Sequence, residues 1–276
     1  MRVRFTYFPG MFSLGLLLAI SACSRVELPS VPPILPYQPS PFLSRGSEHD
    51  HSLVIAIPEN KPPYFNGATN DGIERDILQE AFALVGKHPD FMETADRKKK
   101  YDATRFNIEC VSSISEEYRL DSASYFSDQV VSYHYKLFTL RKKNMVIRDY
   151  SDLAGKTVEA FSSGTRYLGK HFTEVIPKMS AYAEHVNRFS QVALLLLGRV
   201  DVLVIDRDMF HFISSNLLTT RPESYDGDVV ESQLEKAVDL KIACHNKETV
   251  DYFNKGLAML RSSHRYEEIF RHYLHN

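Results

Sequence analysis

Short apolar runs of strand length alternate with segments of helical periodicity from about residue 53 onward. The clearest runs are LVIAI at 53–57 and VDVLVI at 200–205, which suit strands buried on both faces of a parallel sheet. In residues 73–85 the apolar side chains recur at helical spacing, and Gly86 follows as a C-cap. Because strands alternating with helices form α/β units with parallel sheets, this order predicts an α/β fold.

The remaining segments extend the same alternation. Further strands are expected at 90–94, 107–114, 132–141, 157–161 and 239–245. Further helices are expected at 95–106, within 189–199 with Ser190 as the N-cap, and around 247–263 and 264–274. The elements form two clusters with a final strand–helix set left over, which predicts two lobes, the tail returning to complete the first.

The N-terminus has the features of a secretory signal peptide. Arg2 and Arg4 supply positive charge, the apolar run MFSLGLLLAI follows, and small residues precede Cys23. The run is too short to span a bilayer as a mature helix. The residues AISAC resemble the lipobox of bacterial lipoproteins, which implies cleavage after residue 22 and an acylated Cys23, with palmitate among the acyl chains. We therefore expect a cell-envelope protein anchored in the periplasm by lipid, and Ser24 after the lipidated cysteine favours the outer membrane.

Residues 23–50 form the expected link between the lipid and the folded body. Six prolines lie between Leu28 and Pro41, without helical or strand periodicity, which is typical of an extended polyproline tether. The acidic and histidine residues at 48–51 are adjacent on this flexible segment and do not make a preorganised metal site, so no metal is expected.

Composition narrows the class of function. A net charge of −2 and 25% charged residues describe an ordinary globular body with no basic stripe suited to nucleic acid. No serine-nucleophile elbow, zinc-ligand spacing or phosphate-binding glycine loop occurs, so we expect a monomeric binding protein, not an enzyme, with no cofactor and no catalytic residues. With Cys23 acylated, the pair Cys110 and Cys244 remains and allows a disulfide.

Several motifs, in order, carry a resemblance to a known family. They are LVIAIPENKPPYF, DGIERDILQEAFALVG, SISEEYRLDSASYFS, DLAGKTVEAFSSGT, GRVDVLVID and the closing helices around FNKGLAML and YEEIFRHYL. In this order the chain resembles the extracellular solute-binding proteins of polar amino-acid ABC transporters, the bacterial family 3 group, from about Leu53 to Leu274.

The resemblance implies a two-lobe type II periplasmic-binding fold. Each lobe would be a mainly parallel sheet flanked by helices, and two crossing segments would join the lobes. On this basis residues 51–139 and 243–276 form lobe 1, and residues 140–242 form lobe 2. Loops at the carboxyl ends of parallel strands face the cleft, where ligands bind in open α/β sheets.

The resemblance also implies roles for particular side chains. In lobe 1, Ser113, Ser115 and Arg119 would hold a ligand carboxylate, although Arg119 lies one residue late relative to the serine. In lobe 2 the SSGT turn contributes Ser163 and Thr165, whose position before a helix leaves backbone N–H groups able to hold an anion.

Three further residues complete the expected site. Asp206 matches the acid that accepts the ligand ammonium, with the alternative that it only caps the next helix. Tyr64 matches an aromatic residue beside the ligand, or packs between the lobes. Lys61 stands where the family usually has a stacking aromatic residue, so it adds an anion contact or points to solvent.

The resemblance therefore implies capture of a small polar ligand, an amino acid or related compound, for an ABC permease. Two alternatives stay open. One is an exported enzyme on the same fold, a cyclohexadienyl dehydratase-like protein with Glu116 or Glu117 as its acid or base. The other is a sensory or scaffold lipoprotein with no transport role.

Overall fold

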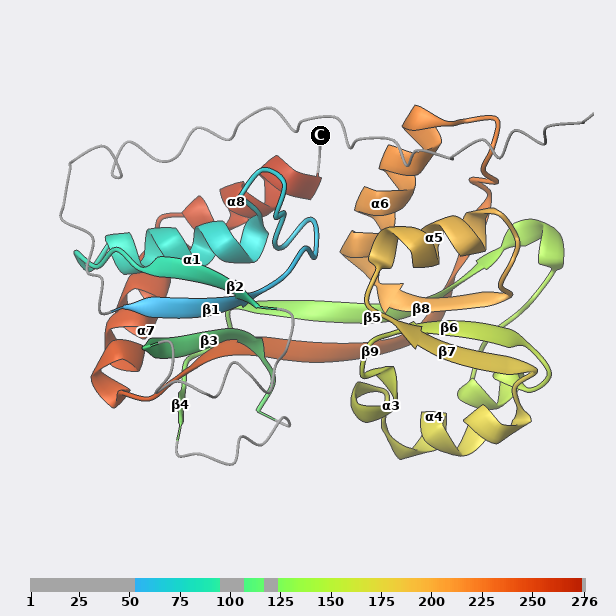
Figure 1. Ribbon diagram of the computed structural model, residues 1–276, viewed down its shortest axis with the longest axis horizontal. Coiled ribbons are helices and arrows are strands. Elements are labelled where there is room, and N and C mark those ends of the chain that lie inside the picture. The colour runs from blue at the N-terminus through green and yellow to red at the C-terminus, as the bar shows by residue number, and fades with distance from the viewer. Residues whose placement is uncertain (1–52, 95–106, 117–123, 275–276) are drawn as a thin grey trace, which may run out of the picture. The chain divides into compact units, whose positions relative to one another are not determined.

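The computed structural model describes residues 53–94, 107–116 and 124–274 (Figure 1). Outside the described residues lie the expected signal peptide, Cys23, the expected tether, the helix expected at 95–106, Glu117 and Arg119. Among the described residues, no helix is long and apolar enough to cross a membrane.

The strands pair in the order β2-β1-β3-β9-β5-β8-β6-β7, and β4 pairs with β9 at one edge. Parallel pairing joins β1 to β2 and β3, and joins β6 to β7 and β8, whereas β5 and β9 pair antiparallel with their neighbours. This agrees with the mainly parallel sheets expected for each lobe. The strands are β1 (Val54–Pro58), β2 (Asp90–Thr94), β3 (Ile108–Ile114), β4 (Tyr125–Phe126), β5 (Val131–Leu140), β6 (Thr157–Phe161), β7 (Ala181–His185), β8 (Val202–Asp206) and β9 (Val229–Cys244).

Helices cover these strands (Figure 1). Helix α1 packs against α7 and α8, and α5 and α6 pack against each other and against β8. The helices are α1 (Ile73–Ala83), α3 (Gly164–Tyr167), α4 (Gly169–Val175), α5 (Arg188–Leu196), α6 (Arg207–Thr220), α7 (Lys247–Ser262) and α8 (Arg265–Leu274). Short 3₁₀ turns are η3 (Arg141–Lys143), η4 (Tyr150–Leu153) and η5 (Ile176–Lys178).

Strands β5 and β9 connect the two groups of parallel strands. They pair with each other from Val131 opposite Leu240 to Leu140 opposite Val229. The far end of β9 then pairs with β3, while β5 pairs with β8 from Tyr135 onward. The two crossing segments are therefore hydrogen-bonded strands, and the domain boundaries expected after residues 139 and 242 fall inside them. Those boundaries stay predictions.

Two local predictions need correction. The strand expected at 239–245 is only the end of β9, whose earlier half is rich in charged residues and lacks an apolar run. Helix α5 begins before Ser190, because the Asn187 side chain accepts a hydrogen bond from the Ser190 backbone N–H and so acts as the N-cap.

Cys110 and Cys244 lie directly opposite each other on β3 and β9. Their Cα atoms are 4.0 Å apart and a disulfide joins them. The two cysteines are 134 residues apart in the sequence, so the bond links the end of β9, near the C-terminus, to β3 in the first group of parallel strands.

A glycine sets the position of Tyr64 relative to α1. Gly72 has φ of +134°, and a Cβ atom there would lie 2.4 Å from the Tyr64 carbonyl oxygen. The Glu74 backbone N–H donates to that same oxygen at 3.1 Å. Glycine therefore lets the loop after β1 pack directly on the start of α1, which fixes the backbone of Tyr64.

A buried hydrogen-bonded chain ties α1 to α8. The Gly72 N–H donates to the Tyr273 hydroxyl at 3.0 Å, and that hydroxyl donates to the Asp76 carboxylate at 2.7 Å. Burial raises the pKa of Asp76 to about 7, although the Tyr273 hydroxyl and Arg75 act to lower it. The folded protein therefore keeps a proton on Asp76 at pH values where the unfolded chain has released it.

This arrangement predicts a pH dependence of stability. Because the folded pKa lies above the unfolded value of about 3.9, the free energy of unfolding should fall as pH rises from about 4 to about 7, by about 4 kcal/mol for this one group. Asp76→Asn keeps an acceptor for Tyr273 and removes the titration, so its profile should be flatter in urea denaturation measured across that range.

Asp128→Asn, at an exposed position, is the matched control and should keep the wild-type profile. Identical pH profiles for Asp76→Asn and the wild type would show that Asp76 titrates normally in the fold.

Candidate functional site

Asp206 is a fully buried carboxylate at the junction of β8 and α6. One oxygen accepts the Met209 backbone N–H at 3.0 Å, which caps α6, and the other accepts the His134 backbone N–H from β5 at 2.8 Å. The Tyr64 hydroxyl, from the loop after β1, donates to the first oxygen at 3.2 Å. Asp206 therefore caps α6, and it also accepts a hydrogen bond from Tyr64, which belongs to the other lobe.

Two carboxyl groups and a phenol meet at this buried position. Burial raises the pKa of Asp206 to about 7, and the nearby Asp208 charge adds to the effect, against the hydrogen bonds from Met209, His134 and Tyr64. The Tyr64 hydroxyl also lies 3.4 Å from the Asp208 carboxylate, and burial with these two acids raises its pKa well above the usual value. A neutral phenol is thus shared between two carboxylates, an arrangement that a cationic group would stabilise.

A second polar cluster lies at the carboxyl end of β3. The pairing of β3 with β9 shifts register between Val111 and Ile114, and Ser113 there has a left-handed φ of +58°. The hydroxyls of Ser112, Ser113 and Tyr133 are buried, and Ser113 lies close enough to the Tyr133 hydroxyl to act on its pKa by hydrogen bonding. Strained backbone beside buried hydroxyls is typical of a ligand-binding wall.

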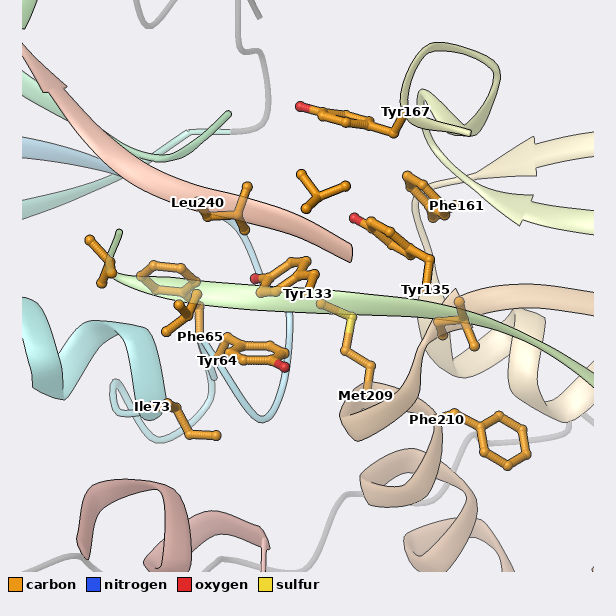
Figure 2. Packing of buried hydrophobic residues seen from close by; sticks show 14 of the residues in the cluster. Tyr64, Phe65, Ile73, Tyr133, Tyr135, Phe161, Tyr167, Met209, Phe210 and Leu240 are labelled. Atoms are coloured by element: carbon orange, nitrogen blue, oxygen red, sulfur yellow. The ribbon is translucent and has the colours of Figure 1, made fainter. Parts of the chain in front are cut away.

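Other predicted lobe 1 residues lie around this cluster. The Tyr64 ring packs on Tyr133 with centroids 4.3 Å apart, and the Lys61 ammonium lies 5.6 Å from the Tyr133 ring centroid. Ser115 is buried just after β3. Figure 2 shows Tyr64 beside Tyr133, so the hydroxyl cluster and the Asp206 acceptor group share one aromatic neighbour.

A row of aromatic rings runs from this point into lobe 2. Tyr135 stacks on Phe161 with centroids 3.8 Å apart and an interplanar angle of 8° (Figure 2). Tyr133 meets Tyr135 edge-on at 6.2 Å, and Tyr167 lies 6.1 Å from Phe161. Since Phe161 ends β6, this stacking holds the turn that follows β6 close to β5.

The SSGT turn after β6 binds a carboxylate of the chain itself. The Ser163 and Thr165 backbone N–H groups each donate to Glu184 at 2.7 Å, one to each carboxylate oxygen, and the Tyr182 hydroxyl donates at 2.7 Å. Partial burial raises the pKa of Glu184, but these hydrogen bonds and the Thr165 hydroxyl outweigh it and hold the pKa below its usual range. The two N–H groups proposed for a ligand anion therefore already have an acceptor.

The structure brings most of the predicted residues into this region. Tyr64 donates a hydrogen bond to Asp206. Lys61 and Ser113 both lie beside Tyr133. The backbone N–H groups of Ser163 and Thr165 donate to Glu184. Arg119 lies outside the described residues. Their roles toward a ligand stay predictions.

Sequence reasoning missed four contributors: Tyr133, the His134 N–H, Asp208 and Glu184. The alternation SYHYKLF in β5 could have pointed to Tyr133, and Asp208 follows Asp206 by two residues. No sequence pattern pointed to Glu184, because it lies on β7 (Ala181–His185), a strand that the sequence did not predict.

Of the two acidic residues considered for an enzyme, the structure describes one. Glu116 is exposed and forms an ion pair with Lys241, and Glu117 lies outside the described residues. Within the described ranges, no group of three or more His, Cys, Asp or Glu side chains is arranged to hold a metal ion.

Comparison with known proteins identifies the fold. No family model and no curated protein matches the sequence. Among solved structures, a GluR0 ligand-binding core in complex with L-glutamate superposes with a TM-score of 0.64 at 14% identity, over 80% of this chain and 97% of that one. A histidine kinase sensor domain with similarity to periplasmic binding proteins superposes with a TM-score of 0.65 at 17% identity, over 82% of this chain and 96% of that one.

An arginine-, lysine-, histidine-binding protein, ArtJ from Geobacillus stearothermophilus, gives a TM-score of 0.62 at 14% identity, over 81% of this chain and 95% of that chain. Identities this low establish shape and no more. The chain has the two-lobe fold of the type II periplasmic-binding proteins, as the motifs at its strand ends predicted.

Proposed function

We propose that the protein is a solute-binding lipoprotein that captures a small polar ligand bearing an amino group, an amino acid or a related compound, between its lobes. The observation that carries this proposal is Asp206, a fully buried carboxylate with a raised pKa at the carboxyl end of a strand. Solved proteins of the same fold bind amino acids, as their descriptions state for glutamate and for arginine.

The chemistry of the two polar clusters supports this ligand class. Asp206 and Asp208 offer acceptors to an ammonium group, and replacing the shared Tyr64 phenol by a cation would pair the buried charge. The buried hydroxyls of Ser112, Ser113 and Tyr133 offer hydrogen bonds to the other end of a small polar molecule.

Delivery to an ABC importer is the role that follows from the resemblance, and the lipobox-like AISAC sequence supports attachment of Cys23 to the membrane. Anchoring in the outer membrane, favoured by Ser24, would place the receptor away from an inner-membrane permease. A sensory role is therefore the second candidate, and the likeness to a histidine kinase sensor domain favours it.

Substitution of Asp206 separates ligand binding from helix capping. Asp206→Asn keeps one oxygen for the Met209 N–H, turns an amide NH₂ toward the His134 N–H and loses the charge, so its fold is first checked by circular dichroism. The folded variant should bind a cationic ligand about 10- to 1000-fold more weakly in calorimetric titration. Asp251→Asn, on the exposed face of α7, is the control. Wild-type affinity in Asp206→Asn would remove this residue from the site.

The raised pKa of Asp206 predicts how affinity depends on pH. Below about 7 the carboxyl is protonated, and a ligand ammonium must displace that proton. Affinity for an amine should therefore fall by about tenfold for each pH unit well below 7 and level off above 7. A pH-independent dissociation constant between 5 and 8 would contradict the assignment.

Replacement of Cys23 tests the anchor. Cys23→Ser should release the protein from the membrane fraction or leave the signal peptide uncut, because the acyl chains supply the attachment at about 0.8 kcal/mol for each buried methylene. Centrifugation of lysed cells and immunoblotting measure this. A mature Cys23→Ser protein that still sediments entirely with membranes would disprove lipid anchoring.

A further inference from the structure

Glu184 occupies the turn that the site's geometry would otherwise offer to a ligand anion. Its two oxygens take the Ser163 and Thr165 N–H groups, and the Thr165 hydroxyl and Tyr182 add to the same carboxylate. A single side chain thus uses both the backbone and the side-chain donors of the turn. Any second carboxylate placed there would meet a negative charge instead of a donor.

The turn and Asp206 lie at the same edge of the sheet. Strand β6 lies between β7 and β8, with Ala160 opposite Glu184 on one side and opposite Val204 on the other. Strands β6 and β8 run parallel, and β6 ends just before the turn while β8 ends at Asp206, so both groups follow the carboxyl ends of neighbouring strands. The Tyr135–Phe161 stack keeps the end of β6 in this place.

This arrangement constrains a ligand whose ammonium pairs with Asp206. In an α-amino acid the carboxylate is attached to the carbon that carries the ammonium, so it lies within a few ångströms of the group that pairs with Asp206, and at this edge of lobe 2 the donors for it are those of the turn. The backbone N–H groups of the turn already donate hydrogen bonds to Glu184. Like charges brought together in a partly buried place repel, which should weaken binding of that ligand by about tenfold or more.

We infer that Glu184 determines specificity at this site, and that the preferred ligand is an amine that carries no carboxylate beside its ammonium group. This inference rests on the proposed function, because it assumes that Asp206 receives the ammonium. The neutral hydroxyls of Ser112, Ser113 and Tyr133 suit a neutral polar group at the other end of such an amine. Glu184 also holds the turn, but a purely structural role would not discriminate between an amine and its carboxylated counterpart.

Matched ligand pairs test the inference on the full-length protein in detergent. The probes are L-arginine with agmatine, L-lysine with cadaverine and L-tyrosine with tyramine, which differ only by the carboxylate. At pH 8, isothermal titration should give at least one amine that binds about tenfold or more tightly than its amino acid. Glu184→Gln keeps the size of the side chain and removes the charge, so it should reduce that ratio by about tenfold.

Glu174→Gln, an exposed position on α4, is the matched control and should keep the wild-type ratio. L-Argininamide and L-lysinamide, titrated at pH 7 so that their less basic α-amino groups stay largely protonated, provide a test in the wild-type protein that does not depend on any variant folding, since the amide replaces the carboxylate at equal size. Each amide should bind more tightly than its acid.

Three results would decide against the inference. In the wild type, an amino acid that binds as tightly as its amine and its amide would overturn the specificity of Glu184 and leave the proposed function intact. Equal changes for both members of a pair in Glu184→Gln would reduce Glu184 to a structural residue. Absence of binding by every probe would overturn the proposed function, and this inference with it.

Discussion

The antiparallel pairing of β5 with β9 is the interaction on which the rest of the structure depends. It connects the two groups of parallel strands, and it carries the groups that define the candidate site. Tyr133 and Tyr135 belong to β5, and between them the His134 N–H binds Asp206. At its far end β9 reaches Cys244, where the disulfide joins it to Cys110 on β3. Relative movement of the lobes must therefore occur by twisting or bending of two hydrogen-bonded strands, since no flexible linker separates them there.

The polar groups of the site divide by chemistry between the lobes. Lobe 2 contributes two carboxylates: Asp206, whose full burial is costly unless a partner compensates the charge, and the partly buried Asp208 beside it. Lobe 1 contributes hydroxyls at the end of β3, together with Tyr64, which already reaches across to both acids. Such a division gives a ligand an orientation, because its cationic end has only one favourable place.

The sequence predicts the buried strands and helices of the fold better than it predicts the residues of the candidate site. Apolar runs such as LVIAI and VDVLVI correspond to β1 and β8, because burial on both faces leaves a pattern that composition alone reveals. Strand β7 and the first half of β9 were missed, since a strand with exposed, charged positions has no apolar run. Asp206 was found because it directly follows a predictable strand, whereas Glu184 was not, because it lies on one of the missed strands.

Glu184 also shows where the transfer of site roles by motif reaches its limit. The Gly164-Thr165 pair of the SSGT turn matches the family segment, so the resemblance assigns Thr165 to a ligand carboxylate, with Ser163 beside it. The donors of such a turn are backbone N–H groups, however, and their availability depends on whatever side chain the neighbouring strand presents. Here β7 presents an acid in register with Ala160, two residues before the turn. A motif fixes the position of donors, but the residue that occupies them comes from elsewhere in the fold, and specificity can change while every residue of the motif is retained.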